Sequence, residues 1–253
     1  MNVLAIDVGG THIKILATGE ETPLKFVSGP KMTAKQMVRE VKKLAAGWNY
    51  DAVSVGYPGP VLHGRILHEP HNLGPGWVGF DFKQAFGCPV KVINDAAMQA
   101  LGSYKGGSML FLGFGTGLGS AMVVDGLLES MELGHLPYRK ATYEDYVGIR
   151  GLKRYGKKKW RKYVLDTVER LSTALEPDEI VLGGGNVKLL QKLPEKCCRG
   201  DNANAFAGGF QLWSKGEIRM STAAVQAQPI LPLVDGQHER SSNPVTKRPA
   251  HLA

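Results

Sequence analysis

Two glycine-rich segments of this 253-residue chain have the composition of phosphate-binding turns. In the first, residues 7–14, Asp7 ends an apolar run, and Gly9 and Gly10 follow at the bend. Glycine lets the backbone come close to a ligand, so that successive N–H groups can form a nest for an anion. Asp7 beside a phosphate could hold Mg²⁺ through water, because magnesium favours carboxylate and phosphate oxygens. The alternative interpretation of this segment is a plain β-hairpin turn.

The second glycine-rich segment, residues 113–119, differs from the familiar phosphate-binding motifs. It lacks the Gly-Lys-Ser/Thr of the P-loop, and position 118, which the dinucleotide fingerprint reserves for glycine, is Leu. Since it leads into another strand, backbone amides and the Thr116 hydroxyl must hold any anion there. A third cluster, residues 183–185, follows an apolar run, and a flat ligand such as an adenine could approach its backbone.

Asn94 and Asp95 follow the apolar run at residues 90–93. A carboxylate that faces a phosphate site can take the proton of a hydroxyl as that hydroxyl attacks phosphorus. Asn94 would then act as a hydrogen-bonding clamp beside it. A plain helix cap is the alternative interpretation of this pair.

Glu132 and His135, three residues apart, can each accept from or donate to neighbouring hydroxyls. This pair suits a polyol better than a metal ion. For His135 alone, a structural role is the alternative.

Strand-like runs and amphipathic helical patterns alternate along the chain, which predicts an α/β protein. A capping box at Thr33 and Gln36 begins one helix, and another has an apolar stripe from Trp160 to Leu175. Each half opens with a strand, a glycine turn and a second strand, so we expect a duplicated domain with a cleft between the halves. Strands are expected at residues 3–6, 13–16, 52–55, 90–93, 109–112, 121–124 and 179–182.

The net charge of +8 arises from one segment, residues 139–162, where ten Lys/Arg face two acidic residues. The rest of the chain is balanced. A local anionic partner would explain this excess, and a solvated helix face is the alternative.

Composition excludes collagen-like, disulfide-framework and wholly disordered proteins, because 43% of the residues are apolar and only three are cysteines. The cysteine content and the absence of a basic-then-apolar leader favour a reducing, cytoplasmic location. The uncharged stretch at residues 106–124 contains six glycines, which indicates strands and a loop and no membrane span.

The five motifs occur in the order found in sugar kinases of the ROK family (bacterial repressors, open-reading-frame proteins and kinases), which the chain resembles over residues 2–213. The resemblance implies an α/β, two-lobed, actin-like ATPase (ribonuclease H-like) fold with mixed sheets and an interlobe cleft. It implies an N-terminal lobe at 1–93, a second lobe at 94–200, and a closing helix at 201–213 that returns toward the first lobe. Residues 214–253, which show no periodic stripe, are expected to form a mobile tail.

The resemblance further implies transfer of a terminal phosphoryl group to the 6-hydroxyl of glucose or a related hexose, with Asp95 as the general base. The sugar would be held by Gly59, Asn72, Asn94, Glu132 and His135. The phosphates and the nucleotide would be held by Asp7, Gly9, Gly10, Thr11, Lys14, Gly115, Thr116, Gly117, Gly183, Gly184 and Gly185, and Mg²⁺ by Asp7, through water.

Many ROK kinases have a cysteine-rich zinc motif after the Glu-x-Gly-His segment. Here no cysteine lies between Cys88 and Cys197, so no zinc site is expected. A Lys/Arg-rich segment takes its place, which resembles the polyphosphate glucokinase branch, and Glu144 is the candidate for the acid that follows the zinc motif. The donor is expected to be ATP or inorganic polyphosphate. A polyphosphate path would run along Lys157, Lys158, Lys159 and Lys162.

The alternative function is that of a non-catalytic, sugar-sensing or sugar-binding ROK protein, which would have no need of Asp95 or of the turn at residues 115–117. A ROK repressor requires an N-terminal helix-turn-helix, and only Met1 and Asn2 precede the first expected strand. The expected partners are a small-molecule sugar and a nucleotide or polyphosphate, without nucleic acid or membrane. Family habit implies a homodimer.

Overall fold

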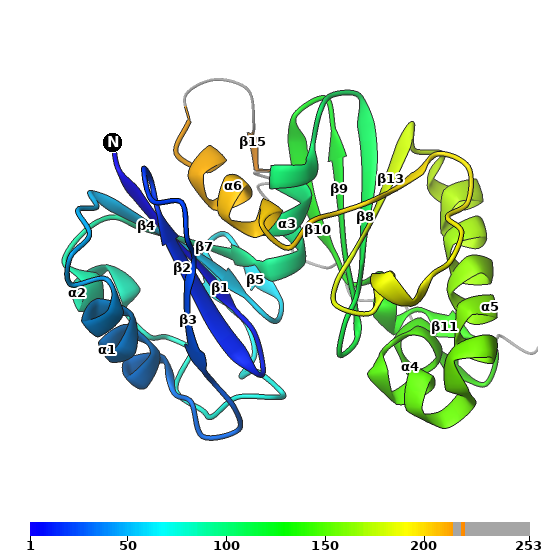
Figure 1. Ribbon diagram of the computed structural model, residues 1–253, viewed down its shortest axis with the longest axis horizontal. Coiled ribbons are helices and arrows are strands. Elements are labelled where there is room, and N and C mark those ends of the chain that lie inside the picture. The colour runs from blue at the N-terminus through cyan, green and yellow to red at the C-terminus, as the bar shows by residue number, and fades with distance from the viewer. Residues whose placement is uncertain (215–218, 221–253) are drawn as a thin grey trace, which may run out of the picture. The chain divides into compact units, whose positions relative to one another are not determined.

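The computed structural model describes residues 1–214 and 219–220, and two mixed β-sheets dominate them (Figure 1). The first sheet has the order β3-β2-β1-β4-β7, and the second has the order β14-β13-β8-β9-β10-β15. The strands of the first are β1 (Val3–Val8), β2 (His12–Ala17), β3 (Leu24–Val27), β4 (Ala52–Tyr57) and β7 (Val90–Asn94). Those of the second are β8 (Ser108–Phe114), β9 (Leu118–Val124), β10 (Leu127–Met131), β13 (Glu179–Gly183), β14 (Cys197–Arg199) and β15 (Arg219–Met220). Two small hairpins pair β5 (Val61–Leu62) with β6 (Arg65–Ile66) and β11 (Pro137–Tyr138) with β12 (Ala141–Thr142).

The two sheets repeat one topology. In each, the first two strands form an antiparallel hairpin, β1–β2 in one and β8–β9 in the other. The next long strand, β4 or β13, then pairs in parallel with the opposite side of the first strand. The predicted duplication is therefore confirmed, and all seven predicted strands are present within one or a few residues of their expected bounds.

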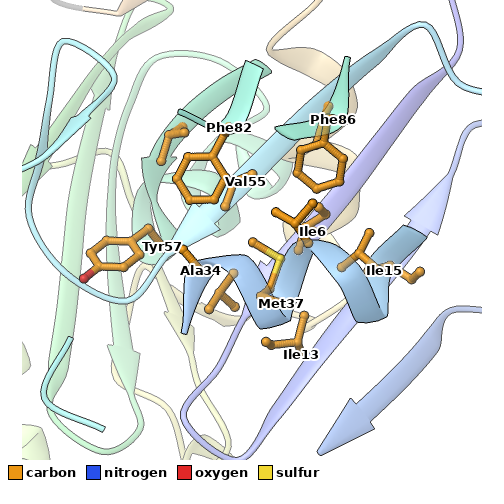
Figure 2. Close-up of a cluster of buried hydrophobic side chains, with 14 of the residues drawn as sticks. Ile6, Ile13, Ile15, Ala34, Met37, Val55, Tyr57, Phe82 and Phe86 are labelled. Carbon is orange, nitrogen blue, oxygen red and sulfur yellow. The ribbon is translucent and has the colours of Figure 1, made fainter. Parts of the chain in front are cut away.

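Helices cover both sheets (Figure 1). They are α1 (Ala34–Leu44), α2 (Phe82–Phe86), α3 (Asp95–Ser103), α4 (Tyr143–Val147), α5 (Ile149–Leu175) and α6 (Asn204–Gln211), with short 3₁₀ turns η1 (Leu133–His135) and η2 (Val187–Leu189). The capping box of Thr33 and Gln36 begins α1 as predicted. Figure 2 shows Met37 of α1 against Ile6 and Ile15 of the first sheet, with the ring of Phe86, from α2, nearby. All four side chains are buried.

The long helix α5 is interrupted at Gly156, whose φ of 70° and ψ of 163° are not helical. After this kink the predicted apolar stripe packs on the second sheet, and Trp160, Val164 and Val168 are buried. The indole Nε1 of Trp160 donates to the Val147 carbonyl at 2.7 Å, which fixes α5 against α4. The lysines beside the stripe are consequently left exposed.

Helices α3 and α6 cross at two glycines. A Cβ on Gly102 would overlap the backbone of Asn204, and one on Gly208 would overlap that of Met98. Such a crossing brings the two backbones into contact, which only glycine permits. Helix α6 also lies on the first sheet, where the buried Ser54 hydroxyl donates to the Gly209 carbonyl at 2.6 Å.

Residues 1–222 form one compact unit, and the second unit, 223–253, lies wholly outside the described residues. The lobe boundaries at residues 93 and 200 therefore stay a proposal. The mobile tail expected at residues 214–253 also falls outside the described residues, apart from Ser214 and residues 219–220. Within the described part of the chain, no helix combines the length and the apolarity needed to cross a membrane.

Candidate active site

The first glycine turn joins β1 to β2. The Gly9 N–H donates to the His12 carbonyl at 3.1 Å, and a Cβ on Gly9 would lie 2.7 Å from that same oxygen, so a side chain does not fit there. At the start of the turn, the Asp7 carboxylate lies 3.6 Å from the Lys14 ammonium, its cross-strand partner. Burial raises the pKa of Asp7, and the charge of Lys14 opposes this. The turn is thus a hairpin with a carboxylate at its start.

Asn94 and Asp95 begin α3, at the end of β7. The Asn94 side chain accepts a hydrogen bond from the Ala97 N–H at 3.1 Å, so the cap that the sequence offered as one interpretation is present. Its amide also donates to the Gly59 carbonyl at 3.1 Å, which brings two of the predicted sugar-binding residues together. Because Asn94 is the N-cap, Asp95 is the first residue of α3 and its carboxylate lies at the first turn of that helix.

Asp95 has a strongly shifted acidity. Burial first, and then the negative charge of Asp7, raise its pKa to about 7. The charge of Glu132, from the second half of the chain, adds to this effect, while the hydrogen bond from Ala96 N–H at 2.8 Å opposes it. A carboxyl group with a pKa near neutrality is suited to accept a proton during catalysis.

The second glycine turn joins β8 to β9 and is held by α4 and α5. Within it, the Gly115 N–H donates to the Gly117 carbonyl at 3.2 Å. From outside, the Ile149 N–H at the start of α5 donates to the Thr116 carbonyl at 3.0 Å. The Glu144 carboxylate lies against Gly117, and a Cβ at this position would displace the end of that side chain.

The third glycine cluster lies against the second turn. Gly184 has a φ of 82°, and a Cβ there would come within 2.6 Å of the Phe114 backbone. Asn186, which follows this cluster, bonds to the second turn twice. Its side-chain amide donates to the Gly115 carbonyl at 3.1 Å, and its backbone N–H donates to the Phe114 carbonyl at 3.0 Å. Nothing in the sequence indicated a role for Asn186, because the residues that it contacts, Phe114 and Gly115, lie far from it along the chain.

Glu132 precedes η1 and His135 is its last residue, directly after β10. Their side chains approach within 3.9 Å, and the His135 side chain is 66% exposed, so this histidine is not part of the core. Burial raises the pKa of Glu132, His135 opposes the shift and Glu144 reinforces it. Both groups are therefore available to a ligand.

Asn72 lies over the first glycine turn, since a Cβ on Gly10 would stand 3.0 Å from the Asn72 Cβ. The structure thus joins Asn94 to Gly59, places Asn72 against Gly10, and couples Asp95 electrically to Asp7 and Glu132. The four candidate lysines of α5 are exposed and form no ion pair with another residue that the structure describes.

Comparison with known proteins shows relatives over most of the chain. The model of the ROK family matches residues 3–148, more than half of the sequence. The polyphosphate glucokinase of Mycobacterium tuberculosis is 28% identical over 202 residues, which cover 71% of this chain and 76% of that protein. The glucokinase of Pyrobaculum calidifontis is 30% identical over 145 residues, 52% of this chain and 48% of its own.

Solved structures share the fold. The inorganic polyphosphate/ATP-glucomannokinase from Arthrobacter sp. strain KM superposes with a TM-score of 0.72 at 23% identity, covering 82% of this chain and 96% of that one. A ROK family glucokinase from Streptomyces griseus, in complex with glucose and AMPPNP, gives a TM-score of 0.69 at 18% identity, covering 84% and 99%. The predicted fold class is therefore confirmed.

Proposed function

The chain belongs to the ROK family and is a glucokinase-like sugar kinase, and we propose that it transfers a terminal phosphoryl group from ATP or polyphosphate to the 6-hydroxyl of glucose or a related hexose. The observation that supports this most is the position of Asp95. Its carboxylate begins α3, and burial together with the charge of Asp7, which begins the first glycine turn, raises its pKa to about 7. Few structural roles need a carboxyl group in that state.

In the proposed reaction Asp95 accepts the proton of the sugar 6-hydroxyl as the oxygen–phosphorus bond forms. The bond between the transferred phosphorus and the donor oxygen breaks, and ADP or a polyphosphate shorter by one unit leaves. The loose transition state needs little covalent help, so most of the catalysis comes from positioning and from neutralising charge. A pKa near the working pH suits this proton transfer.

The sugar would be held on two sides. Asn94, fixed by its bonds to Ala97 and Gly59, would hold one hydroxyl beside Asp95. Glu132 and the exposed His135 would hold others from the second half of the chain. Because these groups come from both halves, closure of the halves on the sugar would expel water that could otherwise be phosphorylated.

The phosphates would be bound by backbone amides of the two glycine turns, and the close contact of Gly9 with the His12 carbonyl leaves no room for a side chain at that position. The residues present fit Mg²⁺: no cluster of three or more His, Cys, Asp or Glu side chains occurs among those described, but magnesium commonly uses one carboxylate with water and substrate phosphates. Asp7 would supply that carboxylate. When bound, Mg²⁺ would neutralise the charge of the transferred phosphates.

The relatives include both a polyphosphate glucokinase and a glucokinase, and we propose polyphosphate as at least one donor. The basic face of α5 supports this, because Lys157, Lys158, Lys159 and Lys162 are exposed along a helix whose first residue bonds to Thr116 in the second turn. A row of cations that leads to a phosphate site would guide a linear polyanion. We also propose that the protein forms the homodimer that the family resemblance implies.

A coupled phosphorylation assay tests the function. Glucose, mannose, fructose and N-acetylglucosamine are each offered with ATP, GTP or polyphosphate, and glucose 6-phosphate is the expected product from glucose. Saturable glucose binding without turnover for any donor would instead establish a non-catalytic sugar-binding protein.

A further inference from the structure

The loop that contains Asn72 is closed by one side chain, that of Glu69. Its Oε2 accepts a hydrogen bond from the Trp77 N–H at 3.0 Å, and its Oε1 accepts from the N–H groups of Trp77 and Val78, both at 3.3 Å. Although burial acts to raise it, these backbone bonds and one from Gly76 lower the pKa of Glu69. The carboxylate is therefore ionised at neutral pH, and its bonds are charge-assisted.

Both ends of this loop are anchored to the body of the first half. The fully buried Trp77 donates from its indole Nε1 to the Met32 carbonyl at 3.2 Å, and the Gly74 N–H donates to the same carbonyl at 3.0 Å. Before the loop, the Tyr57 hydroxyl donates to the His68 carbonyl at 2.8 Å. Between these anchors, the bonds that Glu69 accepts are what close the chain on itself.

Asn72 stands at the far side of this closed loop, next to the first glycine turn. Its Cβ would be 3.0 Å from a Cβ on Gly10, and the following residue, Leu73, is buried. The Asn72 side chain is exposed and makes no hydrogen bond to another side chain among the residues that the structure describes, so the backbone path of the loop decides where it stands.

We propose that Glu69 is a positioning residue for sugar binding, whose carboxylate holds residues 69–78 closed and so keeps Asn72 over Gly10. This inference rests on the proposed function, in which Asn72 contacts the sugar. Glu69 touches neither sugar nor phosphate itself. It acts on the affinity for the sugar and not on the chemical step.

The test compares Glu69→Ala, Glu69→Gln and Asp81→Asn with the wild type. Asp81 is the matched control, because it also accepts a bond from a backbone N–H, that of Gln84 at 2.9 Å, but begins α2. Glu69→Ala is expected to raise the KM and the Kd for glucose about five- to tenfold, as for the loss of one or two hydrogen bonds. The kcat and the donor KM stay within about twofold, Glu69→Gln is intermediate because its amide oxygen still accepts, and Asp81→Asn leaves the glucose KM unchanged.

A double-mutant cycle with Asn72→Ala separates positioning from a general structural effect. If Glu69 acts through Asn72, the glucose KM of the double variant equals that of Asn72→Ala alone. A glucose KM in the double variant raised by the product of the two single-variant increases would overturn the proposal. An unchanged glucose KM in Glu69→Ala would overturn it as well. Thermal unfolding of each variant shows that it is folded at the assay temperature.

Hydrogen exchange of the Trp77 and Val78 amides without sugar gives a result that does not depend on activity. Faster exchange in Glu69→Ala is expected, and unchanged exchange contradicts the closure of the loop. If the wild type binds glucose without turnover, the proposed catalysis fails while the effect of Glu69→Ala on the glucose Kd still decides the positioning role. If the wild type binds no sugar, both proposals fail.

Discussion

Asp95 at the start of α3 and Asp7 at the end of β1 are electrically coupled: after burial, the charge of Asp7 is the largest cause that raises the pKa of Asp95 to about 7. Asp7 lies on β1 and Asp95 follows directly after β7, and β4 lies between these two strands. Asp95 is thus prepared to accept a proton, while Asp7 lies at the start of the first glycine turn.

Replacement of Asp95 by Asn should remove the proposed general base and leave the N-cap of α3, Asn94, in place. The Asn side chain keeps an oxygen that can accept from Ala96, so the start of α3 is preserved. The kcat is expected to fall at least about 10²–10³-fold, while the Kd for glucose changes by only a few-fold. Steady-state kinetics and calorimetry measure the two, and turnover close to that of the wild type would remove Asp95 from the mechanism.

The same substitution should stabilise the fold in a pH-dependent way. The pKa of Asp95 is about 7 in the folded protein and near 3.9 in an unfolded chain, so folding disfavours the ionised form. Below about pH 4 both states bind the proton and there is no penalty. The penalty grows as the pH rises toward 7 and is constant above it.

The advantage of Asp95→Asn in the free energy of unfolding should therefore increase by about 2.5 kcal/mol from pH 5 to pH 8. Urea unfolding in EDTA, without sugar or donor, measures this difference while no bound cation alters the charge near Asp7. An advantage that is flat across this range, or that falls with rising pH, would contradict the raised pKa.

Much of the site was predictable because its residues lie at the ends of strands, and local patterns identify strands well. Val3–Val8 and Val90–Asn94 were visible as β-rich runs, and they place Asp7 and Asp95 at one edge of a parallel arrangement. The cap at Asn94 was also a local signal. The structural interpretation is confirmed, since Asn94 caps α3, while its role toward a sugar stays a prediction.

The contacts that shape the turns were not predictable. The bond from Asn186 to Gly115 and the contact of Glu144 with Gly117 join segments far apart in sequence, and no local pattern specifies them. The kink at Gly156 was missed for a different reason: a single glycine within a helical pattern is usually tolerated, and here its positive φ breaks the helix.

Gly184→Ala should destabilise the fold. Its φ of 82° is unfavourable for an alanine, and the new Cβ would overlap the Phe114 backbone, which cannot give way easily. We expect a loss of about 2–3 kcal/mol in the free energy of unfolding. Gly185→Ala is the matched control, because nothing lies within 4 Å of a Cβ there. Equal stability of the two variants, measured by urea unfolding, would show that Gly184 is not packed as described.

Gly185→Ala in turn discriminates between donors. The open space above Gly185 is where the proposed adenine would approach the backbone, so an added methyl group should raise the KM for ATP about threefold or more. Polyphosphate has no base, and its KM should stay within about twofold of the wild-type value. Kinetics with each donor at saturating glucose measure the two constants, and an equal rise in both would argue against an adenine site at this loop.

The basic face of α5 should matter for polyphosphate alone. Lys158, Lys159 and Lys162 are exposed, and their replacement by Gln removes three charges without touching the apolar stripe around Trp160. The KM for polyphosphate is expected to rise about tenfold or more, and its dependence on salt should weaken, because fewer ions are displaced when the polyanion binds.

The matched control for this variant is the replacement of Lys35, Lys42 and Lys43 by Gln, three lysines that are equally exposed on α1 and carry the same total charge. If net charge alone attracted the polyanion, both triple variants would raise its KM alike. A path along α5 requires a large effect only from the first set, with the KM for ATP within about twofold in both. An unchanged KM for polyphosphate in the α5 variant would leave its lysines as a solvated helix face.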